Sequence, residues 1–551
     1  MNKRVIDQLV CQTPELERNA KTARRWEPIE SDEVLVDLAH KVQVGRKTPT
    51  KYGPIEEWDT SRVRSMARLF YPWTEIHHDL SRWDTGAVED MTEMFSGVTV
   101  IDFDLTGWNT ARVKSMKRMF KNATGFNQAI GCWHVDSVAD MYEMFSGAAS
   151  FNQPLNQWRV TNVTTMQAMF HSAEAFNQCL DAWDVKNVQD MSRMFASARQ
   201  FNQPLNRWDV SRVQTMANMF YRALSFDQPL SNWRVSNVMD MRNMFGNATV
   251  FNQCLDSWDV GNVKDMSLMF YATRQYDQPM NSWNVSNVLD MSSMFRQARS
   301  FNSPLTDWDV SRVQNMSRMF CHATRFDQPI GCWNVGRVTD MEYMFDSATA
   351  FNQPLNGWDV GHVQTMVGMF TEARAFNQPL DRWDVGNVER MTFMFSGASC
   401  FNQALATWDV RKVIELGSMF EDTVAYNQPM DAWNVSNVLG MHRMFCNARA
   451  FDQPLGSWNV SNVQHMKQMF DGADAFSHRE SLAAWATRPV FPTKPTLVSK
   501  EDVCVSCMCA CSEFVETPCK HSALCTGCFD HWRETTNGKP TCPMCRAEFF
   551  A

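Results

Sequence analysis

Several features that mark special classes of protein are absent from the sequence. Its 551 residues include only 23 glycines and 21 prolines, too few for a collagen-like or low-complexity chain. No stretch approaches the roughly 18 consecutive apolar residues that a membrane helix needs. The first residues, Met1 to Gln8, also lack the apolar core of a secretion signal. We therefore expect a folded intracellular, cytoplasmic protein without a membrane-spanning segment.

An excess of basic charge is absent as well. The chain has 52 Lys and Arg against 61 Asp and Glu, which gives a formal net charge of -9 at pH 7. Such a chain has no overall attraction to nucleic acid or to anionic lipid. We therefore expect no nucleic acid and no membrane among its partners.

The sequence also lacks a phosphate-binding loop, a nucleophile elbow and a His-Glu metalloprotease motif. Enzymes of these classes are therefore not indicated.

Tyrosine is scarce, with 8 copies, whereas methionine and tryptophan are abundant, with 38 and 21 copies. This imbalance indicates that a few sequence positions are reused many times. Seventeen tryptophans, from Trp58 to Trp458, follow one another at intervals of 25 residues without an insertion. A unit that repeats without gaps predicts a stack of about 17 similar units over residues 57–480, in which each unit packs against the next.

Two periodicities alternate within a unit. Counted from its tryptophan, apolar residues at +8, +11, +12 and +15 follow the spacing of one helix face. In one unit these residues are Met291, Met294, Phe295 and Ala298. Pro304 would stop that helix, and Leu305, Trp308 and Val310 suggest a short strand. The pattern predicts an α/β repeat solenoid with a short strand and a short helix in each 25-residue unit.

Two polar positions of the unit have predicted roles. Asparagine at +19, in the recurring Phe-Asn-Gln-Pro-Leu, is expected to form a hydrogen-bonded ladder between units. The residue at +1 is aspartate in nine units, at Asp59, Asp84, Asp184, Asp209, Asp259, Asp309, Asp359, Asp384 and Asp409. This row could form a groove for a basic partner, or each aspartate could cap the turn that follows it. We favour the turn cap.

The repeats resemble the BspA-like leucine-rich-repeat family of surface proteins. Repeats of that family read close to Trp-Asp-Val-Ser-Asn-Val-x-Asp-Met-x-x-Met-Phe, with Phe-Asn-Gln-Pro-Leu between them. The resemblance implies a leucine-rich-repeat-like fold and a role in binding or adhesion, not in catalysis. Bacterial members are usually exported, and the absence of a signal here disfavours the adhesin role.

The segments outside the repeats have separate predicted roles. Residues 1–56 are expected to form an N-terminal helical cap, because Ser31 to Val42 has the pattern of an amphipathic helix. The apolar residues of that helix are Val34, Leu35, Leu38 and Val42. Residues 481–502 contain Pro489, Pro492 and Pro495, which indicates a semi-rigid linker.

Residues 503–551 have the composition of a zinc domain. Nine of the 17 cysteines lie between Cys504 and Cys545. The order is Cys504-x2-Cys507-x11-Cys519-x-His521-x3-Cys525-x2-Cys528-x13-Cys542-x2-Cys545, which supplies eight ligands for two tetrahedral zinc ions. Cys509 and Cys511 are alternative ligands near the first pair. So small a domain depends on its metal for folding. Each bound zinc ion contributes on the order of 10 kcal/mol to the folding free energy.

The order of three Cys, one His and four Cys resembles a RING finger. The stretches Pro518-Cys519-Lys520-His521 and Cys542-Pro543-Met544-Cys545-Arg546 carry this resemblance most closely. It implies interleaved zinc sites. One zinc would be held by Cys504, Cys507, Cys525 and Cys528, and the other by Cys519, His521, Cys542 and Cys545.

The RING resemblance also implies a function, because RING proteins act as E3 ubiquitin ligases. They hold a ubiquitin-conjugating enzyme charged with ubiquitin and promote transfer to a substrate lysine. The resemblance assigns Val505, Ser506, Trp532 and Pro543 to contact with the conjugating enzyme. It assigns Arg546 to the linchpin that bonds both the enzyme and ubiquitin, and it implies no covalent catalytic residue.

Two functions therefore stand as hypotheses. In the first, the chain is a RING-type E3 ubiquitin-protein ligase that binds a protein substrate on the repeat surface. In the second, it is a non-catalytic interaction scaffold with a structural zinc module. The second hypothesis rests on Ser506, which stands where RING fingers usually have Ile or Val, with Val505 shifted by one position.

Overall fold

The computed structural model describes residues 26–485, 514–516 and 522–525. The chain divides into two compact units, residues 1–488 and 489–551, and each is considered by itself. The elements of the first unit are α1 Asp32–Gln43, η1 Thr50–Tyr52, η2 Ile55–Glu57, β1 Glu75–Ile76, β2 Val100–Ile101, η3 Ile130–Cys132 and η4 His478–Trp485. The second unit contains β3 Phe514–Glu516 and β4 Ser522–Cys525. Among the residues described, no helix is long and apolar enough to cross a membrane.

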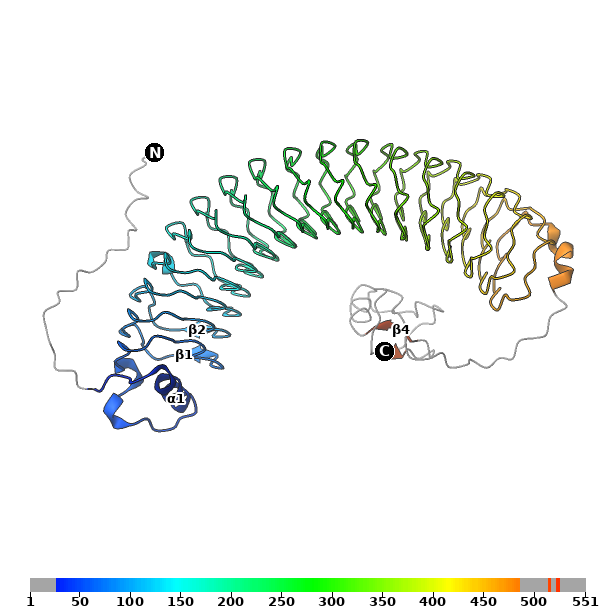
Figure 1. Ribbon diagram of the computed structural model, residues 1–551. Coiled ribbons are helices and arrows are strands. Elements are labelled where there is room, and N and C mark those ends of the chain that lie inside the picture. The colour runs from blue at the N-terminus through cyan, green and yellow to red at the C-terminus, as the bar shows by residue number, and fades with distance from the viewer. Residues whose placement is uncertain (1–25, 486–513, 517–521, 526–551) are drawn as a thin grey trace, which may run out of the picture. The chain divides into compact units, whose positions relative to one another are not determined.

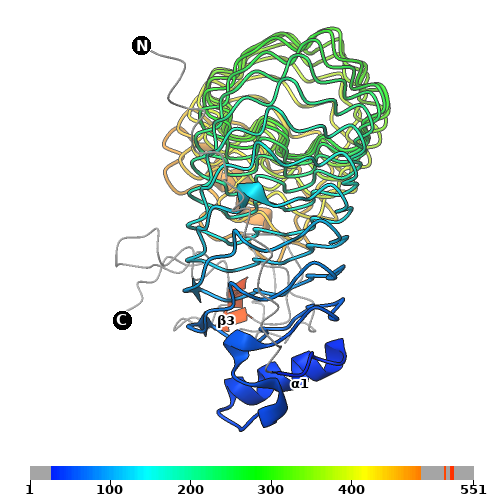
Figure 2. The ribbon, with the colours of Figure 1, turned by 90° about the vertical axis from the view of Figure 1, so that its left-hand side faces the viewer.

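Helix α1 covers the N-terminal end of the repeats (Figures 1 and 2). Ser31 is its N-cap, and the side chain of Ser31 accepts a hydrogen bond from the Val34 N–H at 3.4 Å. Leu35 and Leu38 are buried in the core that α1 shares with the repeats. The amphipathic helix predicted at this end is therefore confirmed.

The repeats form a curved stack of coils, each 25 residues long (Figure 1). Parallel β-bridges join the +7 residue of one coil to the +7 residue of the next, from Ser65↔Asp90 to Gly440↔His465. In the described part of the repeats, the one two-residue parallel sheet is separate from these bridges, because β1–β2 pairs Glu75 with Val100 and Ile76 with Ile101, at +17 and +18. Within residues 26–485, regular strands and helices are few, and the stack is held by bridges and turns.

The prediction of a short helix in each unit is wrong. In the coil that starts at Trp283, the N–H of Met294 donates to the Met291 carbonyl at 3.2 Å, three residues back. The N–H of Met291 donates to the Asn315 carbonyl of the next coil at 3.1 Å. The backbone is left-handed at Ser293 and Gln297, with φ of 56° and 60°. These residues turn the chain. Alternate N–H groups therefore donate to carbonyls of the neighbouring coil and not to carbonyls within a helix.

The prediction of a strand through Leu305, Trp308 and Val310 is also wrong. The Trp308 N–H donates to the Leu305 carbonyl at 3.4 Å, which closes a turn at that point. The β-bridge of this coil lies later, at Asn315. The apolar residues of both predicted elements are nevertheless buried, because tight turns with the same spacing direct them to the core.

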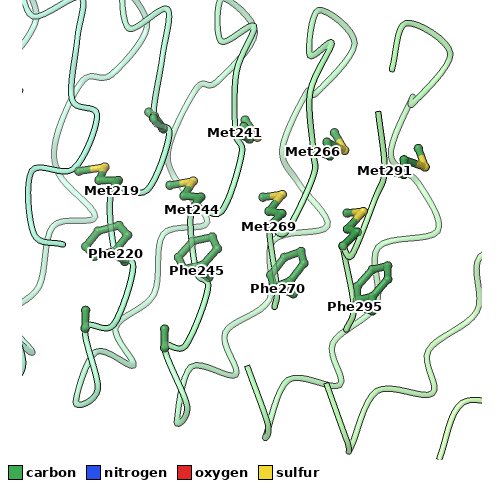
Figure 3. Packing of buried hydrophobic residues seen from close by; sticks show 14 of the residues in the cluster. Met219, Phe220, Met241, Met244, Phe245, Met266, Met269, Phe270, Met291 and Phe295 are labelled. Carbon is green, nitrogen blue, oxygen red and sulfur yellow. The ribbon is translucent and has the colours of Figure 1, made fainter. Parts of the chain in front are cut away.

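The core consists of columns, each made of the residues at one position of successive coils (Figure 3). The rings of Phe295 and Phe320 stack with their centroids 5.7 Å apart, and those of Trp283 and Trp308 with theirs 6.4 Å apart. The Trp308 indole N–H donates to the Met280 carbonyl at 2.9 Å. Each large buried side chain contributes about 1.5–3 kcal/mol before the loss of conformational entropy.

The two polar positions have the roles predicted for them, a hydrogen-bonded ladder between coils at +19 and a turn cap at +1. The Asn152 Oδ1 accepts the Asn177 N–H at 3.0 Å, and this bond recurs along the +19 column as far as Ser477. At +1, the Asp209 Oδ1 accepts the Ser211 N–H at 3.1 Å. The Ser211 hydroxyl and N–H keep the pKa of Asp209 below its usual value. The favoured turn-cap interpretation is therefore confirmed.

The described part of the stack ends at Trp485. Its ring stacks on Trp458 with a centroid distance of 6.4 Å and so continues the tryptophan column. Residues 481–485, assigned from the sequence to the linker, thus belong to η4.

Candidate functional site

One predicted zinc ligand falls within the described part of the second unit. Cys525 is the last residue of β4, and β4 pairs antiparallel with β3, with Cys525 opposite Phe514. The register of the pair shifts between Val515 and Glu516. Cys525, the first residue of the Cys525-x2-Cys528 pair, is therefore at the end of a strand.

The other predicted residues of this site lie outside the described residues. They are the ligands Cys504, Cys507, Cys519, His521, Cys528, Cys542 and Cys545, the contact residues Val505, Ser506, Trp532 and Pro543, and Arg546. The donor set of seven thiols and one imidazole fits zinc, a borderline-soft ion that prefers sulfur and nitrogen.

A polar groove on the stack is a second candidate site. It spans coils between Gln189 and Lys264 and has a volume of about 630 Å³. Its walls are formed by residues at +4 and +6, including Arg212, Asn237 and Met239. Met239 is 43% exposed to solvent, which is a high exposure for an apolar residue. The groove has two cationic side chains, Arg212 and Lys264, and no acidic residue in its lining.

The backbone beneath this groove is fixed. The Gln214 N–H donates to the Gln189 carbonyl at 2.8 Å, and the Met239 N–H donates to the Gln214 carbonyl at 2.9 Å. The Asn237 Nδ2 donates to the Ser211 carbonyl at 2.6 Å. The side chains thus extend from a rigid ladder, which reduces the entropy lost when a partner binds.

Comparison with known protein families accounts for most of the chain. Five overlapping segments, residues 42–158, 144–257, 223–323, 303–408 and 378–485, match the family described as Mycoplasma protein of unknown function, DUF285. The chain belongs to the DUF285 family. Residues 500–550 match the zinc fingers of C3HC4 type, the RING fingers. A RING-type zinc finger, and with it zinc binding, therefore follows the DUF285 repeats.

Other comparisons add little to this assignment. No curated protein matches the chain. Among solved structures, it is similar to the chain of "Crystal structure of TLR13-ssRNA13 complex", with 10% identity over 73% of this chain and 83% of that chain. The TM-score of 0.15 is too low to support a shared fold. A leucine-rich-repeat-like solenoid therefore stays a prediction.

Sequence reasoning missed the groove of the DUF285 stack. The sequence does contain a signal, because +4 and +6 flank the buried valine at +5 and are polar in most units. Their variation between units concealed that Arg212 and Lys264 share one groove with four amide side chains. Only the stacking of coils places residues from four units together.

Proposed function

We propose that the chain is a RING-type E3 ubiquitin-protein ligase. The observation that carries this proposal is the RING finger at residues 500–550, in one chain with a long repeat stack. The RING recruits a ubiquitin-conjugating enzyme charged with ubiquitin, and the stack holds a protein substrate. A RING contributes no nucleophile, and its effect on transfer comes from positioning and electrostatics.

The residues that carry recruitment follow from the RING resemblance. Trp532 and Pro543 pack against the conjugating enzyme, beside the residues Val505 and Ser506. Arg546 bonds both the enzyme and ubiquitin and holds the thioester in position for attack by a substrate lysine. Two zinc ions, on the interleaved ligand sets, maintain the geometry of this surface.

The DUF285 stack supplies the substrate surface in this proposal. The resemblance to BspA-like repeats supports binding as its role, and the groove at residues 189–264 is the part best suited to it. Arg212 and Lys264 favour an acidic segment of the substrate, and the exposed thioether of Met239 offers a small apolar contact. An acidic protein surface is therefore the class of substrate that we propose.

The decisive experiment is ubiquitin transfer in vitro with the full chain. The reaction contains activating enzyme, a panel of conjugating enzymes and ubiquitin, with Arg546→Ala and Cys519→Ser as variants. We expect ubiquitin conjugates with the wild type and their loss in both variants. Arg546→Ala should keep its zinc, whereas Cys519→Ser should lose one ion, so the two variants separate recruitment from folding.

The alternative is an interaction scaffold, and the observation that favours it is Ser506. A polar residue at this contact weakens the apolar interface with a conjugating enzyme. If no enzyme of the panel supports transfer while the RING still holds two zinc ions, the scaffold becomes the better assignment. In that case Ser506→Ile should restore transfer if this contact is the cause.

We propose the cytoplasm as the location, since ubiquitin transfer and reduced cysteine ligands both require an intracellular compartment. Fractionation of cells that express the full chain tests this proposal.

A further inference from the structure

Three side chains of metal-ligand type converge in the stack, away from the RING sequence. Cys321 and His322 occupy +13 and +14 of the coil that starts at Trp308, and Asp346 occupies +13 of the next coil. A thiol sulfur, an imidazole nitrogen and a carboxylate oxygen of these residues all lie within 4.8 Å of one another. Cys321 is buried at 2% exposure, and the other two are half-buried.

The stacking of coils fixes this arrangement. The His322 N–H donates to the Asp346 carbonyl at 2.6 Å. The backbone of His322 is left-handed, with φ of 58°, as at +14 in many other coils, and histidine tolerates this conformation better than most residues. The three side chains therefore come together through the same ladder that builds the stack.

The ligands of the cluster supply the negative charge that a divalent cation needs, while the guanidinium groups of Arg296 and Arg318 also lie near Cys321. The Cys321 thiol donates to the Asp346 Oδ2 at 3.4 Å, and the Ser347 Oγ donates to the Asp346 Oδ1 at 2.8 Å. The guanidinium of Arg296 makes a cation–π contact with the ring of Tyr271 in the preceding coil, 5.6 Å from the ring centroid. One thiolate and one carboxylate would neutralise a bound dication.

We propose that Cys321, His322 and Asp346 form a zinc site in the stack, distinct from the two RING sites. Sulfur, nitrogen and oxygen donors together fit zinc, and three protein ligands leave a fourth position for water. The Sγ–Oδ2 separation of 3.4 Å is close to the distance of about 3.5 Å between two ligands of a tetrahedral zinc ion. The bound metal takes the place of the thiol proton.

The chain contains a matched control for this site. Cys446 occupies +13 of the coil that starts at Trp433, is buried at 4% exposure and precedes Asn447. Asp471 stands at +13 of the following coil. This position therefore repeats the thiol and the carboxylate but has an amide in place of the imidazole.

Zinc content of the full chain tests the proposal. Wild type, Cys321→Ala, His322→Asn, Asp346→Asn and Cys446→Ala are equilibrated with the same buffered zinc and desalted, and zinc per chain is measured. We expect the wild type and Cys446→Ala to hold one zinc ion more than the other three. Equal zinc content in all five proteins would overturn the proposal.

Two further measurements exclude misfolding as the cause of a loss. His322→Asn reproduces the residue found naturally at position 447, so it should keep the fold. Added zinc should raise the thermal midpoint of the wild-type stack but not that of His322→Asn. Asn447→His should gain one zinc ion. Absence of both the midpoint shift and the gain would contradict the site even if the zinc contents differ.

Discussion

The backbone N–H of Asp227 donates to the Oδ1 of Asn202, 25 residues earlier in the chain, at 3.0 Å. The same Oδ1 also accepts the Gln228 Nε2 at 3.0 Å. One side-chain oxygen thus satisfies two donors of the next coil, and this arrangement recurs along the +19 column. Aspartate replaces asparagine at several positions of the column without a change in the bond, as at Asp277.

Asn202→Ala should destabilise the stack, because it leaves a backbone N–H and an amide without their acceptor. The expected cost is about 1–3 kcal/mol. Asn202→Asp is the control, since it keeps the acceptor oxygen and should have a small effect. Denaturant unfolding followed by tryptophan fluorescence checks both variants. Equal midpoints for Asn202→Ala and Asn202→Asp would show that the ladder contributes little.

Asp340→Asn should raise stability at neutral pH. Burial raises the pKa of Asp340, so its ionised form opposes folding at neutral pH, and this penalty disappears as pH falls through the folded pKa. Asparagine keeps the acceptor for the Glu342 N–H, as Asn315 does for Ser317. The gain in unfolding midpoint should therefore shrink towards about pH 4.

Asp209→Asn provides the opposite case in the same chain. The pKa of Asp209 is lowered by Ser211, so its carboxylate supports folding above the unfolded pKa, and this support is lost as pH falls through the folded pKa. We expect Asp209→Asn to lower the midpoint slightly at neutral pH and to have no effect at low pH. Shifts of the same sign in both variants would contradict the assignment.

Charge reversal in the groove should weaken substrate modification. Arg212→Glu with Lys264→Glu is expected to cost about 1 kcal/mol or more, a loss of about fivefold in binding. Arg312→Glu is the matched control, because Arg212 and Arg312 donate from Nη1 to an asparagine Oδ1 at the same distance of 2.7 Å. The readout is the set of proteins in a eukaryotic extract that become ubiquitinated only when the wild-type chain is added.

Self-ubiquitination should be unchanged in the double variant Arg212→Glu with Lys264→Glu and in the control Arg312→Glu, which separates a failure of the groove from a failure of the ligase. If the modified proteins persist in Arg212→Glu with Lys264→Glu, the substrate binds elsewhere on the stack. An equal loss in Arg312→Glu would indicate a general charge effect.

Zinc removal should unfold the RING but leave the DUF285 stack folded. The stack has its own core, whereas the RING depends on its ions. A chelator should abolish ubiquitin transfer, while limited proteolysis should still yield a resistant fragment close to residues 26–485. Rapid digestion of the repeats after chelation would contradict this separation.

The sequence predicts the inside of the stack well and its backbone poorly. The apolar positions, represented by Met291, Met294, Phe295 and Ala298, are all buried as expected. Their spacing fits a helix because a series of tight turns also returns to the same side every three or four residues. The difference lies in Ser293 and Gln297, whose backbone is left-handed. The only signal for this in the sequence is the glycine or asparagine that several units have at +14, such as Gly147, Gly397 and Asn447.

The candidate sites show the same limit. The RING is recognisable from sequence because its ligands lie within one short segment, from Cys504 to Cys545. The groove and the Cys321 cluster combine residues from separate coils, so they become visible only when the coils are stacked. Cys321 and Asp346 are 25 residues apart, and their sequence neighbourhoods contain no ligand motif that would pair them.

The uninterrupted 25-residue period makes the stack modular in length. Excision of residues 258–282 would join Ser257 to Trp283, and every column would continue across the join because each residue takes the place of its equivalent. Loss of 24 or 26 residues would instead misalign every column beyond the join. Genes for such a protein can therefore gain or lose binding surface by unequal recombination in whole units, with both ends of the stack left intact.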